Sequence, residues 1–145
     1  MSQSLIVENS IRIDAPVIRV WEVLTKSHYV RQWKNLPEDF GDFEVLPATV
    51  INLPGSSTMT IVEFEPNKKL YYHVVLPEWV DQQTNIGYTY NLSTDENGHT
   101  WLGIQVGDFA LITEGNKYYD ESVMFGKTAS QKIKELAEMH DNTVH

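Results

Sequence analysis

The chain has 145 residues, which is the size of one ordinary domain, contains no cysteine and carries a formal net charge of -9. Without cysteine it has no disulfide, no cysteine-zinc site and no thiol nucleophile, and its acidity disfavours nucleic acid and anionic membrane surfaces as partners. No basic-then-apolar leader is visible, and no apolar run approaches the roughly 18 residues that span a bilayer. We therefore expect a cytoplasmic protein without membrane insertion.

The first third of the chain predicts one strand followed by two short helices. Residues 5–13 are rich in β-branched side chains, as is typical of a strand. Pro16 suits the first turn of a helix. The apolar residues that follow have helical spacing and form one face, at Val17, Val20, Trp21 and Leu24. A second short helix is expected to hold Val30 and Trp33 and to end before or at Pro37.

From Phe43 onward the pattern changes to strands separated by turns. The expected strands cover residues 43–53, 58–65, 70–76, 84–93 and 99–109. Residues 54–57, with the sequence Pro-Gly-Ser-Ser, form a strong turn signal, and residues 95–98, with Asp-Glu-Asn-Gly, indicate a hairpin.

The last segment predicts a long amphipathic helix over residues 116–139, followed by a mobile tail at 140–145. Its apolar side chains fall near one face, at Tyr119, Val123, Gly126, Ala129, Ile133, Leu136 and Ala137. Such a helix must bury its stripe against the concave face of the sheet. The sequence thus predicts a single α+β domain over residues 1–145, in which a curved antiparallel sheet of about six strands wraps a long C-terminal helix.

The order of these elements, with particular residues, resembles the START-like superfamily, also called SRPBCC, helix-grip or birch-pollen-allergen-like. Within it the chain is similar to the branch named after the activator of the heat-shock-protein-90 ATPase. The matching segments are residues 11–13, 15–16, 20–25, Trp33, 64–70, the hairpin around Gly98 and the terminal helix. The sequence departs from the branch at Gly41, where the branch often has two glycines, and after Gly126, where it usually has tryptophan.

The resemblance implies a binding fold, because members of the superfamily hold lipids, hormones and polyketides, and a few are enzymes. It implies a small apolar or amphipathic ligand between the sheet and the terminal helix, and no cofactor. The branch name alone implies a second possibility, a co-chaperone-like partner of other proteins. Fold does not decide between them.

Strand alternation selects the side chains that would line the space under the helix. On the strands the candidates are Val62, Phe64, Tyr72, Val74, Tyr88, Tyr90, Leu102, Ile104, Val106 and Asp108. On the helices and the intervening segment they are Trp33, Phe43, Val123, Gly126, Ala129 and Ser130.

Three features of this set leave alternatives open. The small residues around Gly126 either let the sheet approach closely or leave a void. The tyrosine hydroxyls bind either a ligand or other side chains. Trp33 and Trp79 are either a lid over the pocket or an edge of the core.

Catalysis has no motif in this sequence, which contains no nucleophile elbow, phosphate loop or dinucleotide fingerprint. The five histidines have no metal-ligand spacing, so we expect no metal site. An enzyme of the cyclase or hydrolase type would depend on Asp108, Tyr88 and Tyr90. If Asp108 faces inward it is a candidate acid or base, and if it ends the strand it faces water or caps the next loop.

Overall fold

The computed structural model describes residues 5–34, 45, 49–52, 58–75 and 86–139. Its elements follow the predicted order and confirm the α+β class. They are β1 Val7–Ile13, α1 Val17–Thr25, α2 Ser27–Trp33, β2 Val50–Asn52, β3 Thr58–Glu65, β4 Lys69–Val75, β5 Ile86–Thr94, β6 Thr100–Gly107, the 3-10 turn η4 Phe109–Leu111 and α3 Gly115–Met139. The predicted tail at 140–145 lies outside the described residues, as does most of the predicted strand over 43–53.

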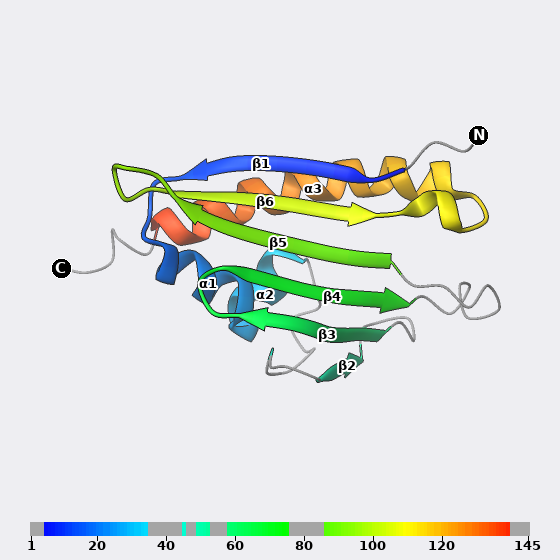
Figure 1. The fold of residues 1–145 in the computed structure, drawn as a ribbon, viewed down its shortest axis with the longest axis horizontal. Helices are drawn as coiled ribbons and strands as arrows, with labels where there is room; N and C mark the ends of the chain where they lie inside the picture. Colours follow the sequence, from blue (N-terminus) through cyan, green and yellow to red (C-terminus); the bar gives the residue numbers. More distant parts are fainter. Residues whose placement is uncertain (1–4, 35–44, 46–48, 53–57, 76–85, 140–145) are drawn as a thin grey trace.

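All six strands form one antiparallel sheet in the order β1-β6-β5-β4-β3-β2 (Figure 1). The first strand pairs with the last, in register from Val7 opposite Val106 to Ile13 opposite Thr100. The buried Thr100 side chain also donates a 2.8 Å hydrogen bond to the carbonyl of Ala15, just before α1. The start of the chain is thereby fixed to its last strand.

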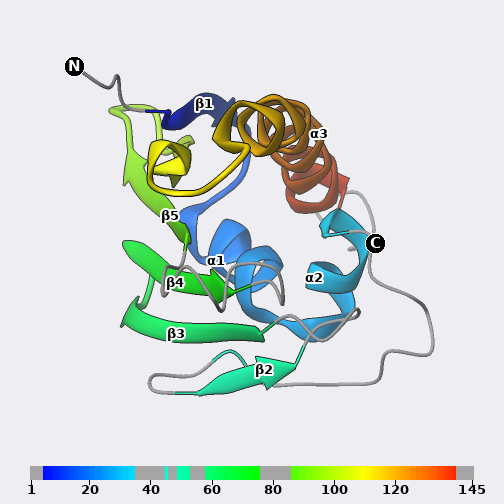
Figure 2. The same ribbon diagram turned by 90° about the vertical axis from the view of Figure 1, so that its right-hand side faces the viewer.

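The three helices lie on one side of the curved sheet, so the sheet has a covered inner face and an open outer face (Figure 2). Helix α3 runs along β1, whereas α1 and α2 lie beside the β3–β5 part of the sheet. On β4 and β6 burial alternates residue by residue, which is the pattern of strands with one covered face. No helix among the described residues is long and apolar enough to cross a membrane.

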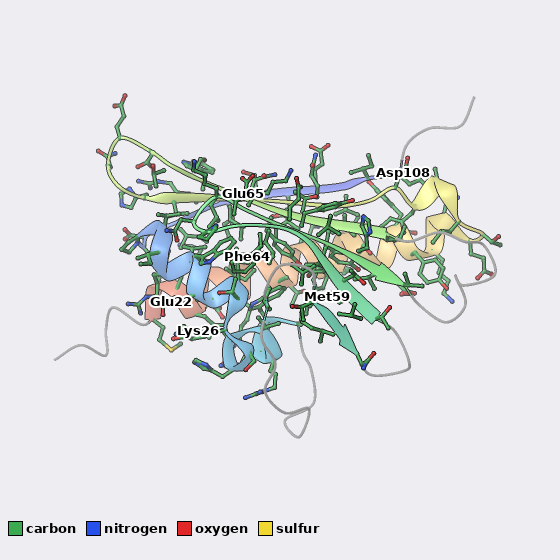
Figure 3. The ribbon with its side chains drawn as sticks, turned by 60° about the horizontal axis from the view of Figure 1, so that its bottom comes forward. Glu22, Lys26, Met59, Phe64, Glu65 and Asp108 are labelled. Atoms are coloured by element: carbon green, nitrogen blue, oxygen red, sulfur yellow. The ribbon has the colours of Figure 1, made fainter. Side chains whose placement is uncertain are left out.

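Strand β3 departs from the predicted alternation, and the placement of Val62 was wrong. The register with β4 shifts between Ile61 and Glu63, so Val62 is the extra residue of a β-bulge. Its side chain is 46% exposed, while Met59 and Ile61 are buried in its place. Beyond the bulge Phe64 is partly buried against the core again, as predicted (Figure 3). Its ring meets that of Trp21 edge-on, with the ring centroids 5.1 Å apart.

Candidate functional site

The end of α2 places an aromatic ring in the core. Trp33 is only 3% exposed, and its indole nitrogen donates a 2.8 Å hydrogen bond to the carbonyl of Val23 in α1. This bond fixes the ring, because a buried indole N–H needs an acceptor. Of the two readings of Trp33, the structure shows an edge of the core rather than a lid. Trp79 and Phe43 lie outside the described residues.

Three tyrosines meet on the inner face of β4 and β5. Tyr72 lies directly opposite Tyr88 in the antiparallel register, and their rings stack with centroids 5.3 Å apart. Tyr90 points the same way as Tyr88, two residues further along the strand. Its hydroxyl lies 2.6 Å from the hydroxyl of Tyr72. Alternation places Tyr88 and Tyr90 on one face of β5, and the register with β4 brings Tyr72 beside them.

Four rings surround a single cation, and we call them the aromatic cage: Trp33, Tyr72, Tyr88 and Phe125. They come from α2, β4, β5 and α3. The cation is the ammonium of Lys34, the residue that caps the C-terminal end of α2. Its nitrogen lies 4.9 Å from the ring centroid of Tyr72, 5.2 Å from Tyr88, 5.5 Å from Trp33 and 5.6 Å from Phe125.

Burial shifts the pKa values of Lys34 and of the three tyrosines in opposite directions. Loss of hydration disfavours the charged form of an ionisable group. Burial therefore lowers the pKa of Lys34 to about 7. The same cause raises the pKa of Tyr88 to about 12 and raises the pKa of Tyr72 and of Tyr90 further above their usual range. Near neutral pH the phenols are thus hydrogen-bond donors, and only Lys34 changes its charge.

Most of the other predicted strand residues face the core. Those buried on the inner face are Val74, Leu102, Ile104 and Val106. Tyr88 and Val123 are partly buried against the same core. Burial on the covered side is what the alternation predicted, and a role for these side chains in contacting a ligand stays a prediction.

Asp108 has a structural role at the end of β6, and the reading as a cap is the one observed. Its carboxylate accepts hydrogen bonds from the backbone N–H groups of Leu5, at 2.8 Å, and of Ala110, at 2.9 Å. It contributes to a hollow of about 170 Å³ whose other walls include outer-face residues such as Tyr71. Figure 3 places it at the opposite end of the molecule from Glu22 and Lys26 of α1. Asp108 therefore lies outside the aromatic cage.

The small residues of α3 allow close packing. A Cβ atom added to Gly126 would lie 3.5 Å from Val7 and 3.8 Å from Asn9, both in β1, which is ordinary contact. Ala129 and Ser130 are buried, and the Ser130 hydroxyl donates to the carbonyl of Lys127 one turn earlier. The space beside Gly126 is therefore about the size of one methyl group, which is neither an approach that only glycine permits nor a void large enough for a ligand.

Sequence reasoning missed two members of the site, Lys34 and Phe125. Lysine is rarely buried, so a lysine at a helix end is ordinarily assigned to solvent. Phe125 stands next to Gly126 in the helix, and a three-to-four-residue spacing from Ser122 and Ala129 would have placed it near the covered side. No pattern in the sequence indicates that a lysine from one helix and a phenylalanine from another meet.

The outer face has a second hollow, of about 360 Å³, over Gly103. Its walls are polar side chains that include Glu8, Ser10, Asn91 and Gln105. It exists because Gly103 has no side chain and an added Cβ would meet nothing within 4 Å. Within the described ranges no three histidine, aspartate or glutamate side chains gather as metal ligands would.

Solved structures share this arrangement over nearly the whole chain. A protein from Mesorhizobium loti superposes with a TM-score of 0.77 at 21% identity, over 97% of this chain and 99% of that chain. A protein from Rhodobacter sphaeroides gives a TM-score of 0.68 at 18% identity, over 97% and 93% of the two chains. The Aha1 dimer from Colwellia psychrerythraea gives 0.65 at 15% identity, over 92% and 96%. The comparison with curated proteins found no match.

The sheet wrapped on a terminal helix and these neighbours show the helix-grip fold. A family model described as "Activator of Hsp90 ATPase homolog 1-like protein" matches residues 14–138. The chain therefore belongs to that family, as the sequence resemblance predicted. The family's fold is a general platform for binding small molecules or proteins.

Proposed function

We propose that the protein binds a small amphipathic molecule, mostly apolar, between its sheet and α3, at the aromatic cage. The observation that supports this is the convergence of rings from α2, β4, β5 and α3 around one flexible side chain, that of Lys34. Aromatic side chains present large apolar faces with few internal degrees of freedom, which suits them to ligand contact.

Lys34 is the movable part of this arrangement. The rings are held by neighbours, since Trp33 bonds to Val23 and the Tyr72 hydroxyl bonds to Tyr90. A lysine side chain has four rotatable bonds, and Lys34 lies at the C-terminal cap of α2 rather than inside the helix. Swinging the stem outward opens the centre of the cage to a ligand ring without moving the backbone.

The test uses an uncharged apolar probe, N-phenylnaphthylamine, whose fluorescence rises when it leaves water. We expect saturable binding to the full chain and at least a tenfold loss of affinity in Tyr88→Ala, which removes one wall of the cage. The matched control is Tyr71→Ala, because Tyr71 lies on the outer face, where its hydroxyl lies 2.8 Å from a ring nitrogen of His73. Equal effects of the two substitutions, or no saturable binding, would contradict the proposal.

A further inference from the structure

Lys34 is a partly buried cation, and the groups around its ammonium are aromatic rings rather than carboxylates. Its ammonium lies within 6 Å of four ring centroids, the range in which cation–π attraction acts. This attraction offsets part of the cost of removing an ammonium from water, but it supplies no opposite charge. Buried charges in proteins are therefore ordinarily paired with an opposite charge.

The opposite charge is missing from the part of the chain that the structure describes. Other cations there form ion pairs, such as Lys69 with Glu63 at 2.9 Å and Arg12 with Asp95 at 3.3 Å. Lys34 has no carboxylate within ion-pair distance among the same residues. One negatively charged group placed beside Lys34 would therefore supply the ion pair that the described residues do not form.

The hydroxyl groups of Tyr72 and Tyr90, near Lys34, also lack one hydrogen-bond acceptor among the described residues. The single hydrogen bond between the hydroxyls of Tyr72 and Tyr90 uses one of their two protons. The second proton has no acceptor within the described residues. An unused donor in a buried position is costly, and an acceptor supplied by a ligand relieves that cost. The ring of Tyr72 also faces Lys34, so the unused donor and the cation belong to neighbouring parts of one site.

We propose that the ligand of this site carries an acidic group, a carboxylate on an aromatic or aliphatic body, which pairs with the Lys34 ammonium and accepts from the Tyr72–Tyr90 hydroxyl pair. This inference rests on the proposed function and narrows its ligand class. The apolar body packs on the cage rings, and the acid supplies the missing charge and the missing acceptor. Charge-assisted hydrogen bonds of this kind are about twice as strong as neutral ones.

The attraction is local, because the protein as a whole repels anions. The chain carries a net charge of -9, so long-range steering does not favour an acid. The titratable groups that face Lys34 from β4 and β5 are phenols, Tyr72 and Tyr88, with Tyr90 behind them. Burial raises the pKa of all three, so they stay neutral donors between about pH 6 and pH 9. The protonation of Lys34 therefore controls the affinity for the acid.

The experiment compares naphthoic acid with naphthamide, which have the same ring system and differ in charge. Titration calorimetry on the full chain at about pH 6.5, where the lysine is mostly protonated, should show the acid binding at least tenfold more tightly than the amide. Lys34→Met keeps the length of the side chain and removes the charge. It should abolish the preference, so that the acid and the amide bind the variant with equal affinity. Lys117→Met, which removes an exposed lysine of α3, should leave the preference unchanged.

The wild-type chain supplies a second test that needs no variant. Naphthoate stays ionised above about pH 6, but Lys34 loses its proton above about pH 7. Affinity for the acid should therefore fall by up to tenfold per pH unit above that value, while affinity for the amide stays constant. Equal binding of acid and amide, or a preference that survives in Lys34→Met, would overturn the inference and leave the proposed function standing. Failure of both compounds and of N-phenylnaphthylamine to bind would overturn both.

Discussion

At the scale of single residues, Lys34 links the site to the stability of the fold. The unfolded chain holds the lysine proton up to its ordinary pKa of 10.5, whereas the folded chain releases it at about 7. Between these values the unfolded state binds more protons, so this residue's destabilisation is complete below about pH 7 and disappears as pH rises towards 10.5.

Lys34→Met should therefore increase the free energy of unfolding, and this increase should become smaller as the pH rises. The difference in the free energy of unfolding between variant and wild type should narrow by at most about 1.4 kcal/mol per pH unit above pH 7. Urea denaturation at a series of pH values measures it, with Lys117→Met as the exposed control. A gain that does not change with pH would show that packing, and not charge, distinguishes the variant.

Residues also show where sequence reasoning succeeds and fails. Tyr72 and Tyr90 were placed correctly because alternation on an uninterrupted strand needs no knowledge of neighbours. Val62 was misplaced because a bulge depends on how β3 pairs with β4, and no residue in the run from Thr58 to Glu65 signals the extra residue. Lys34 was missed because three of the four rings around it come from β4, β5 and α3, which are distant in the sequence.

At the scale of elements, the two glycines of α3 differ in the space available for a side chain. Gly126 lies mid-helix, where an added Cβ meets β1 only at ordinary contact distance. Gly115 begins the helix, where an added Cβ would lie 2.0 Å from the carbonyl oxygen of Phe109. The first position tolerates a methyl group, and the second cannot accept one without displacing backbone.

Gly126→Ala should stabilise the protein by about 0.5–1 kcal/mol, because alanine restricts the unfolded chain and favours the helix. Gly115→Ala should destabilise it, by at least as much, because the turn at Phe109 must move. Chemical denaturation of the two variants beside the wild type tests both signs. Destabilisation by Gly126→Ala would mean that α3 and β1 approach more tightly than the distances to Val7 and Asn9 indicate.

At the scale of the whole molecule, the order of elements was predictable because each carries its own periodic signal. The bounds of α3 differ by one residue from those expected, and all six strands lie within or near their predicted ranges. What the pattern left open was the position of α3 across the sheet. The structure places it along β1, so the aromatic cage forms towards β4 and β5, where α2 and α3 meet.

Residues on either side of β1 form hydrogen bonds with the C-terminal part of the chain. At its start the carbonyl of Leu5 accepts a 3.0 Å hydrogen bond from Phe109, just before α3. At its end the backbone N–H of Asp14 donates to the carboxylate of Glu138, near the end of α3, at 2.7 Å. The residues on either side of β1 thus contact the segment that precedes α3 and the last turn of α3, so we expect α3 and β1 to separate from the sheet together.

Hydrogen exchange should therefore show β1 and α3 opening together. Their slowest amides should have free energies of opening within about 1 kcal/mol of each other and should decline in parallel as urea is added. Strand β2 should exchange earlier, because among the described residues its three positions pair with β3 alone, at the sheet edge. If α3 instead exchanges through a separate, lower-energy opening, the helix detaches on its own and gives a ligand a second route to the cage. In that case opening of the site would involve α3 as well as the side chain of Lys34.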